Sequence, residues 1–475
     1  MEKSSIYSTV ARKAPLLKAL SDQIWEFAEL SMAERKSADA YCKLLAREGF
    51  RVETNLCGIP TAFSGSFGSG RPVIGILGEF DALSGLSQQA DTLRHTPLTE
   101  GGCGHGCGHN LLGAASLGAA MAIKEEIAAG RLSGTVVFYG CPGEEGCAGK
   151  TFMARDGMFR DLDAALCWHP GDVNQVTTGS NAASLQITYT FTGIASHAAD
   201  DPHSGRSALD AAELMNVGVQ FLREHMPSKS SVHYSFLDAG GVSPNVVQPT
   251  ATLDYMIRGE NVTKAKALRQ RVDDIARGAA LMTGTCVSWK QIDGTASTLS
   301  NRVIEKVLFK NLLEAPAPEY TDRELAFAQA LRETYAHDTL PGSSQDDADI
   351  EAFLRERTQD NQKALADFVV PYKPSSRFSP GSTDVGDVSW LTPTAQFTAV
   401  TWPCGTPGHS WQAVSMGKST IAEKGMLLAA KVLAGAAGDL MSDPALLEAA
   451  RTEFNRSAAA GYDCPIGPEV SPTIG

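Results

Sequence analysis

Cysteine, histidine and glycine are concentrated in one short segment, Gly102-Cys103-Gly104-His105-Gly106-Cys107-Gly108-His109-Asn110. Thiolates and imidazoles are good metal ligands, and glycines give a flexible backbone that can wrap around an ion. The segment therefore predicts a metal site. Two other interpretations are open from these residues alone: a glycine-rich turn with incidental cysteines, and a cysteine nucleophile with a nearby histidine.

Further groups that can bind a metal ion follow short apolar runs typical of buried strands. Glu144 and Glu145 come directly after a predicted strand at 135–139. Adjacent carboxylates are costly to bury unless a cation neutralises them, although an exposed loop pair is an equally good interpretation in isolation. His169 follows a predicted strand at 164–168, where a lone histidine is more often an ordinary core or loop residue.

The combination of these groups favours a metal centre. Buried strands alternate with helices, which is typical of an α/β layer with a largely parallel sheet. The carboxyl ends of parallel strands meet at one edge of a sheet, and open α/β sheets bind their ligands there. His409 follows a strand at 395–401, and Glu79 and Asp81 follow a strand at 73–77. A site for two ions fits this set of groups at a single edge: one thiolate, several imidazoles and the carboxylates.

A second type of pattern begins near residue 184. Apolar residues alternate with polar ones at 185–191, and helices and strands then follow in the order β-α-β-β-α-β. Strands and helices of the first type return at 395–401 and 422–433, so this unit is inserted into the α/β layer. We predict a catalytic domain formed by residues 1–183 and 297–475 and an inserted domain at 184–296. We expect a polar surface insertion, to which we assign no chemistry, at about 315–380.

Length and composition agree with this organisation. The chain has 475 residues, more than one compact core usually holds. A net charge of −13 argues against nucleic acids and anionic membranes as partners. No apolar run approaches the ~20 residues of a membrane span, and the first residues lack the pattern of a secretory signal. Because ten cysteines then indicate a reducing compartment, we expect a cytoplasmic protein.

The metal-compatible residues resemble the M20 metallopeptidase/amidohydrolase family, in the subgroup that uses a Cys-Gly-His ligand pair. The resemblance covers nearly the whole chain and is weakest at about 310–375. It rests on HGCGHNLL at 105–112, FYGCPGEE at 138–145, GRSALD at 205–210, SPNVVQ at 243–248, STDVGDVSW at 382–390 and KGMLLAAK at 424–431. It implies a zinc-peptidase-like catalytic domain, mostly parallel in its sheet, with an inserted α+β lid/dimerisation domain.

The resemblance also implies roles for individual residues. It makes Glu144 the general base, and we expect Asp81 to orient a ligand. Cys103 and His105 form another Cys-Gly-His pair, but the family pattern places the ligand pair directly before Asn110. The implied ligands of two divalent ions, Mn²⁺ or Zn²⁺, are Cys107, His109, Glu145, His169 and His409.

Three residues of the inserted domain resemble functional positions of the family. His197, contributed by a partner's inserted domain, is expected to stabilise the oxyanion of the tetrahedral intermediate. Asn245 and Arg258 match positions that contact the substrate carboxylate, and a guanidinium can engage both oxygens of such a group. The residues alone also allow an ordinary loop histidine at 197 and a surface charge at 258.

The implied activity is hydrolysis of an N-acyl or N-aroyl amino acid. The favoured substrate is p-aminobenzoyl-glutamate, cleaved to p-aminobenzoate and glutamate; a conjugate of the indole-acetyl-aspartate type or a dipeptide is the alternative. The resemblance implies a homodimer or a heterodimer with a homologous partner chain, and a chain active only with that partner is a second hypothesis. A thiol hydrolase that uses Cys107 is a third hypothesis, and activity that survives chelation would support it.

Overall fold

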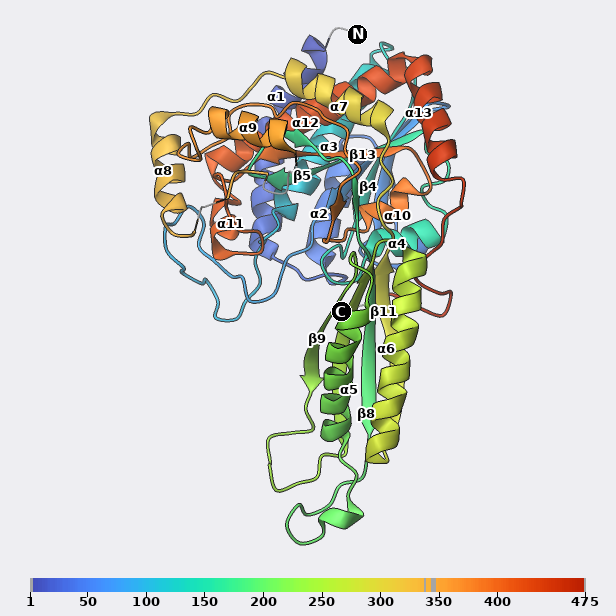
Figure 1. Cartoon of the computed structure of the whole chain (residues 1–475). Coiled ribbons are helices and arrows are strands. Elements are labelled where there is room, and N and C mark those ends of the chain that lie inside the picture. The colour runs from blue at the N-terminus through green and yellow to red at the C-terminus, as the bar shows by residue number, and fades with distance from the viewer. Residues whose placement is uncertain (1–2, 337–338, 343–346, 474–475) are drawn as a thin grey trace.

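The computed structural model describes residues 3–336, 339–342 and 347–473. Figure 1 shows a broad body of helices around a sheet, from which a narrow domain projects. The N-terminal end of the described chain lies at the body, the C-terminal end lies where the body meets the narrow domain, and the narrow domain is formed by the middle of the sequence. We call the narrow domain the lid; it extends from β8 (Ala183–Thr192) to β11 (Cys286–Thr295).

The body is built on a seven-stranded sheet in the order β1-β2-β4-β3-β5-β13-β6. The four central strands, β4, β3, β5 and β13, are parallel, while β1, β2 and β6 pair antiparallel at the two sides. The predicted mostly parallel sheet is therefore confirmed for its centre, where the candidate ligands lie. The strands are β1 (Arg51–Thr54), β2 (Phe63–Ser69), β3 (Val73–Glu79), β4 (Gly134–Cys141), β5 (Ala164–Gly171), β6 (Gln175–Val176) and β13 (Thr394–Val400).

Helices cover both faces of this sheet because the central strands are apolar on both sides. One face packs against a large buried cluster with α1 (Ser4–Phe27), α2 (Arg35–Arg47), α3 (His109–Ala128), α7 (Arg302–Glu314) and α12 (Thr420–Ser442). The other face packs against α4 (Gly149–Arg155) and α10 (Val385–Ser389). In the described chain, α12 alone is long and apolar enough to cross a membrane, and 83% of its apolar window is buried in the body.

The lid has the β-α-β-β-α-β order that the sequence predicts. Its four strands pair antiparallel in the order β11-β8-β10-β9, and the alternating side chains of β8, from Leu185 to Phe191, are buried under two helices. Polar side chains occupy the other face, which explains the period of two in the sequence. The remaining lid elements are α5 (Ala208–Leu222), β9 (Ser231–Asp238), β10 (Thr250–Gly259) and α6 (Val262–Thr283).

The segment at 315–380, which we expected to be a polar surface insertion, packs residues into a buried cluster with the body. Residues 337–338 and 343–346 of this segment lie outside the described residues. In the described part, α8 (Asp322–Arg332) and α9 (Ala348–Arg357) bury Leu331 and Leu354 in a cluster that includes Trp402. The guanidinium of Arg332 is buried and donates to the backbone oxygens of 361, 362 and 404. The insertion thereby supports the loop that leads to His409.

Two short strands, β7 (Ser180–Asn181) and β12 (Phe378–Ser379), join the end of the insertion to the body. The remaining helices are α11 (Trp411–Met416) and α13 (Pro444–Ser457).

Candidate metal centre

The candidate ligands meet at the carboxyl edge of the four parallel strands. Glu79 is the last residue of β3, and Glu144 and Glu145 follow the end of β4. His169 lies inside β5, which continues to Gly171, so the prediction that this strand ends at residue 168 is wrong. The longer strand still delivers His169 to the same edge, because its last residues pair with β13.

Three groups of three side chains can each hold one metal ion, and the five predicted ligands form two of them. Cys107, His109 and His169 form the first ion site, and Cys107, Glu145 and His409 form the second; within each site the ligand atoms lie within 4.8 Å of one another. The Sγ of Cys107 lies 3.3 Å from Nε2 of His169, and Nε2 of His409 lies 3.3 Å from Oε1 of Glu145. The structure thus brings all five predicted ligands together, with the thiolate shared between the sites.

The chemistry of these atoms fits two divalent cations. Nε2 of His109 and Oε1 of Glu145 are buried and have no hydrogen-bond partner among the described residues. Buried polar atoms are normally satisfied, so two such atoms at one cluster indicate a missing partner. One thiolate, three imidazoles and one carboxylate are suitable ligands for Zn²⁺ or Mn²⁺.

The glycine-rich segment before α3 brings Cys107 to this cluster. Gly108 adopts φ +73°, a left-handed conformation that favours glycine, and α3 begins at the next residue, His109. A Cβ atom at position 108 would lie 3.0 Å from the side chain of Pro170. Gly108 therefore permits both the turn and the close approach of the ligand pair to β5.

Hydrogen bonds fix the orientation of two ligand rings. Nδ1 of His109 lies 2.8 Å from Oδ1 of Asp81, and Nδ1 of His169 lies 2.7 Å from the backbone oxygen of Pro170. Both rings therefore present Nε2 to the cluster, as second-sphere partners of metal-binding histidines commonly arrange. The geometry agrees with the role predicted for Asp81. Burial disfavours its charge, but His109 and hydrogen bonds from Ser31 and Glu145 lower the pKa of Asp81 to about 2.

His409 is held in a strained conformation at the exposed side of the cluster. Its φ is +52°, which is uncommon for a residue other than glycine, and its N–H donates to the oxygen of Gly106. Strain of this kind persists where the surroundings enforce it, often at functional sites. The side chain of His409 is 54% exposed, whereas that of Glu145 is 9% exposed, so the cluster opens to solvent beside His409.

Glu144 lies beside the first ion site. One of its oxygens is within 4.8 Å of ligand atoms from His109 and Glu79. Burial, followed by the charges of Glu79 and Asp384, raises the pKa of Glu144 well above its ordinary value. A carboxylate with a raised pKa is a stronger base than an ordinary carboxylate, which favours the proton acceptance that a general base must perform.

Three buried charged residues near the cluster have no role in our sequence-based prediction. Lys150 is fully buried and its Nζ lies 2.7 Å from Oε1 of Glu79 and 2.5 Å from Oδ1 of Asp384. Glu34 is also fully buried and accepts from the N–H of Gly143, in the loop that carries Glu144. Burial and the charge of Asp81 raise the pKa of Glu34 to about 8. Lys150 lies in α4 and Glu34 directly before α2, and neither position carries a local signal for such contacts.

The second Cys-Gly-His pair does not join the cluster. His105 is buried, and its Nε2 lies 3.0 Å from the backbone oxygen of Ile24. Asn110 donates to the hydroxyl of Ser21 and the backbone oxygen of Gly417. Both contacts anchor the start of α3 against neighbouring segments.

The predicted lid residues lie at opposite ends of the lid. His197 and Asn245 are close together, since residues 197 and 246 form a β-bridge and the N–H of Ala198 donates to the oxygen of Asn245. They lie beyond β8 and before β10, at the end remote from the body (Figure 1). Arg258 lies near the body, where its Nε donates to Ser382. The two ends of β10 are about 30 Å apart. A single chain therefore does not bring Asn245 and Arg258 to one carboxylate.

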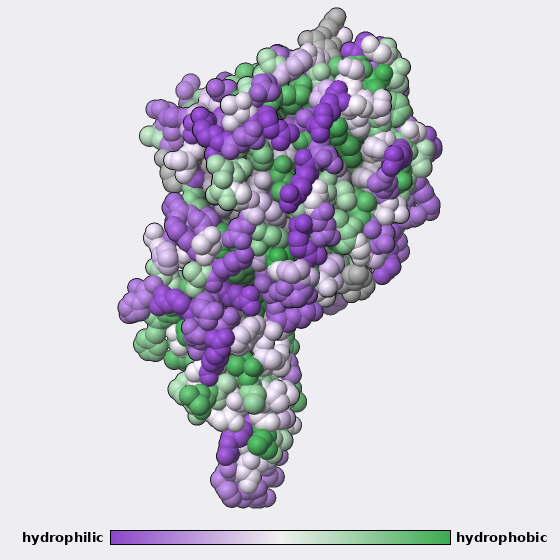
Figure 2. Space-filling model, turned by 90° about the vertical axis from the view of Figure 1, so that its right-hand side faces the viewer, coloured by the Kyte–Doolittle hydropathy of each residue, from purple (hydrophilic) through white to green (hydrophobic). Residues whose placement is uncertain are grey.

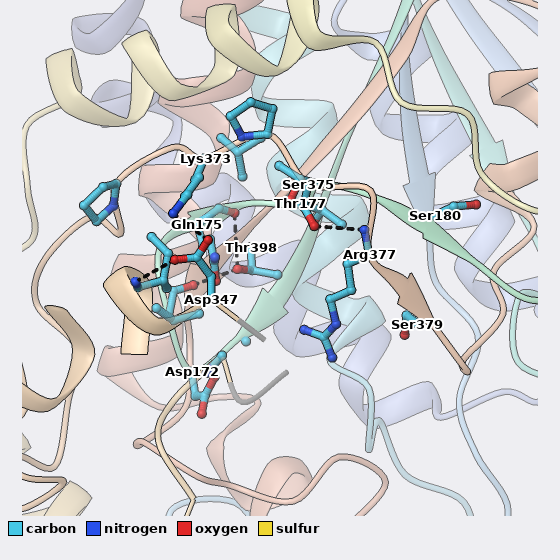
Figure 3. A pocket seen from close by; sticks show the side chains of 18 residues that line it. Asp172, Gln175, Thr177, Ser180, Asp347, Lys373, Ser375, Arg377, Ser379 and Thr398 are labelled. Atoms are coloured by element: carbon cyan, nitrogen blue, oxygen red, sulfur yellow. Dashed lines mark hydrogen bonds and ion pairs between the residues drawn. The ribbon is translucent and has the colours of Figure 1, made fainter. Parts of the chain in front are cut away.

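A polar cavity of about 340 Å³ lies apart from the candidate ligands, between the insertion and the sheet edge (Figure 3). Lys373 and Arg377 are the cations among its lining residues, and Lys373 is paired with Asp347 and Asp349 at 2.7 and 2.9 Å. Asp172, also on its wall, accepts the N–H groups of Gly342 and Gly405. Asp172 thus connects the end of β5 to the insertion and to the loop before His409, which indicates a structural role for this region.

Comparison with known proteins identifies the family. A sequence model described as peptidase family M20/M25/M40 matches residues 75–438. The chain therefore belongs to this family of metal-dependent hydrolases, whose members typically hold two metal ions, and it is an enzyme.

Individual relatives extend this result. The chain is 44% identical over 462 residues to the B subunit of p-aminobenzoyl-glutamate hydrolase from Escherichia coli (strain K12), covering 96% of this chain and 95% of that protein. It is 30% identical over 241 residues to the A subunit of that hydrolase, covering 48% of this chain and 54% of the other. A dinuclear metal-binding M20 peptidase from Bacillus subtilis shares the fold, with a TM-score of 0.55 and 18% identity over 91% of this chain and 99% of the other.

Proposed function

We propose that the protein is a dinuclear metal amidohydrolase that cleaves p-aminobenzoyl-glutamate to p-aminobenzoate and glutamate. The observation that carries the proposal is the cluster of five metal-compatible side chains with Glu144 beside it. The similarity to one chain of a p-aminobenzoyl-glutamate hydrolase, over nearly the whole length, favours this substrate.

Amide hydrolysis needs a better nucleophile than neutral water and a more electrophilic carbonyl. When bound at the two sites, the metal ions would lower the pKa of a water and polarise the carbonyl. Glu144 would accept the proton of that water and deliver it to the leaving amine. The raised pKa of Glu144 supports its role as proton acceptor.

Arg258 is our candidate for holding the glutamate part of the substrate. Its guanidinium is half-buried and donates to Ser382, which lies two residues before Asp384. Asp384 pairs with Lys150, and Lys150 also pairs with Glu79 at the metal centre. This chain of contacts links Arg258 to the metal centre. Because a planar guanidinium can donate to both oxygens of a carboxylate, it is suited to an anionic substrate in a chain with a net charge of −13.

We further propose that His197 and Asn245 act in the site of a partner chain, where His197 would stabilise the oxyanion. Their position at the remote end of the lid supports this arrangement. The lid also exposes apolar side chains: Leu214, Val217 and Phe221 lie on one face of α5, and Phe221 is 70% exposed. On the face shown in Figure 2, apolar side chains reach the surface along the narrow part of the molecule. A surface of this kind favours a protein partner.

The partner is either a second copy of this chain or a homologous chain. The names of the two Escherichia coli relatives, the B and A subunits of one hydrolase, support a heterodimer. For the metal, thiolate and imidazole ligands favour Zn²⁺, while carboxylates accept Mn²⁺. We propose Mn²⁺ or Zn²⁺ at both sites.

One set of measurements tests the function. The purified chain is analysed for bound metals, reconstituted with Mn²⁺ or Zn²⁺, and assayed with p-aminobenzoyl-glutamate, indole-acetyl-aspartate and dipeptides. We expect p-aminobenzoyl-glutamate to be cleaved with the highest kcat/KM, and exhaustive chelation to abolish turnover until metal is restored. Activity that survives metal removal would instead support a thiol mechanism at Cys107. Activity only after addition of a homologous chain would assign this protein to a heterodimer.

A further inference from the structure

Glu79 has the geometry of an additional metal ligand. Its Oε2 lies 3.2 Å from Nε2 of His109, close to the 3.3 Å separations of Cys107 from His169 and of Glu145 from His409. An oxygen of Glu79 and Nε2 of His109 are thus separated like two ligands of one ion. Nε2 of His109 is buried without a hydrogen-bond partner among the described residues. A cation between Nε2 and the oxygen of Glu79 would give both atoms a partner.

Lys150 fixes the other oxygen of the same carboxylate. Its fully buried Nζ lies 2.7 Å from Oε1 of Glu79, and both its Nζ and its backbone N–H donate to Asp384. Lys150 therefore holds Glu79 in one orientation and leaves Oε2 facing Nε2 of His109, and these two atoms form a group with an oxygen of Glu144. Asp384 supplies a second negative charge, so the buried lysine remains paired when Glu79 binds a cation.

We propose that Glu79 is a fourth protein ligand of the ion held by Cys107, His109 and His169, and that Lys150 is the positioning residue that orients it. This inference rests on the proposed dinuclear centre and adds to it. The other arrangement of these atoms is an ion pair between Glu79 and a protonated His109. A histidine must lose the proton from its ligating nitrogen to bind metal. Once His109 binds through Nε2, that ion pair is lost and Oε2 of Glu79 faces the ion.

The added carboxylate changes the expected metal preference of the first ion site. Catalytic zinc sites commonly have three protein ligands, which Cys107, His109 and His169 alone would provide. Carboxylate oxygens suit harder ions such as Mn²⁺. Glu79 should therefore strengthen Mn²⁺ binding more than Zn²⁺ binding.

Metal titrations of the metal-free full-length protein, in competition with a chromophoric chelator, test the ligand without any substrate. We expect Glu79→Gln to weaken Mn²⁺ binding at one of the two sites by at least the 10- to 100-fold loss typical of second-sphere changes. Zn²⁺ binding at that site should weaken less. Glu324→Gln is the matched control. It also removes a carboxylate that is paired with a lysine, because Glu324 in α8 of the insertion pairs with Lys424 in α12. Wild-type affinity of Glu79→Gln for both ions would overturn the proposal, whichever amide the enzyme cleaves.

Cobalt substitution provides a second readout that a purely structural role of Glu79 would not change. Loss of one ligand lowers the coordination number of Co²⁺ and intensifies its visible d–d absorption. We expect this change in Glu79→Gln. We expect a smaller change in Lys150→Met, because this variant keeps Glu79 but lacks the lysine that orients its carboxylate. Lys424→Met is the control for loss of a paired lysine. Spectra of Glu79→Gln identical to the wild type would exclude Glu79 as a ligand, and this outcome does not depend on whether Lys150→Met folds.

Discussion

At the scale of single residues, Glu144 is the side chain whose loss should separate turnover from binding. Glu144→Gln keeps the shape of the side chain but removes its ability to accept a proton. We expect kcat to fall by about 10²- to 10⁴-fold, the usual contribution of a general base. Metal content, measured by elemental analysis, and the unfolding transition should stay at wild-type values. A metal-replete variant with near-normal kcat would show that another group moves the proton.

Asp81 should act on the metal through His109. Asp81→Asn weakens the acceptor that fixes Nδ1 of His109, and it alters the contacts to Ser31 and the N–H of Glu145. We expect metal affinity to fall by about 10- to 100-fold, as for other partners of metal-binding histidines. Chelator competition measures the loss. If affinity is unchanged while kcat falls, Asp81 tunes the reaction and does not position the ligand.

At the scale of elements, the strands and the ligand positions were predictable because their signals are local. Apolar runs marked β3, β4, β5 and β13, and the Cys-Gly-His segment marked the start of α3. The supporting contacts were not predictable. Lys150 reaches Asp384 across 234 positions of the chain, and Gly143 reaches Glu34 across 109. The buried packing of the insertion was missed for the same reason, since its apolar residues are scattered among polar ones and meet only in the fold.

Asp293 in β11 makes the stability of the lid depend on pH. Burial, and then the charges of Asp254 and Asp384, raise its pKa from 3.8 to about 7 in the folded protein. The unfolded chain therefore releases this proton first as pH rises, and the free energy of unfolding falls between pH 3.8 and about 7. Asp293→Asn removes this cost. We expect the variant to be more stable than the wild type at pH 8, by up to about 4 kcal/mol, and equally stable at or below pH 3.8.

Denaturant unfolding of wild type and Asp293→Asn at several pH values measures this difference. Glu260→Gln is a suitable control, because Glu260 directly follows β10, is partly exposed, and has a pKa that Lys229 and Lys264 lower. A difference between wild type and Asp293→Asn that is constant with pH would show that Asp293 is ionised in the folded protein.

At the scale of the whole molecule, the lid of one chain carries candidate site residues at two ends, and these two ends cannot reach the same active site. Arg258 lies at the body, and His197 and Asn245 lie at the far end of strands about 30 Å long. Two copies that pair through their lids can each place the remote end of one lid at the body of the other. In a symmetric pair of this kind, every site combines residues from both chains. The apolar face of α5 and the open edge of β9 are the surfaces available for such pairing.

Mixing two inactive variants tests this arrangement directly. His197→Ala keeps the metal centre and Glu144, whereas Glu144→Gln keeps the lid. If the lid acts in the partner's site, a hybrid dimer contains one site with an intact body and an intact lid. Equal amounts of the two variants, dissociated and reassociated, should recover about a quarter of wild-type activity, because half of the dimers are hybrids with one working site of two. Differently tagged chains and tandem purification verify that hybrids form. Hybrid dimers that remain as inactive as their parents would place His197 in the site of its own chain or outside the reaction altogether.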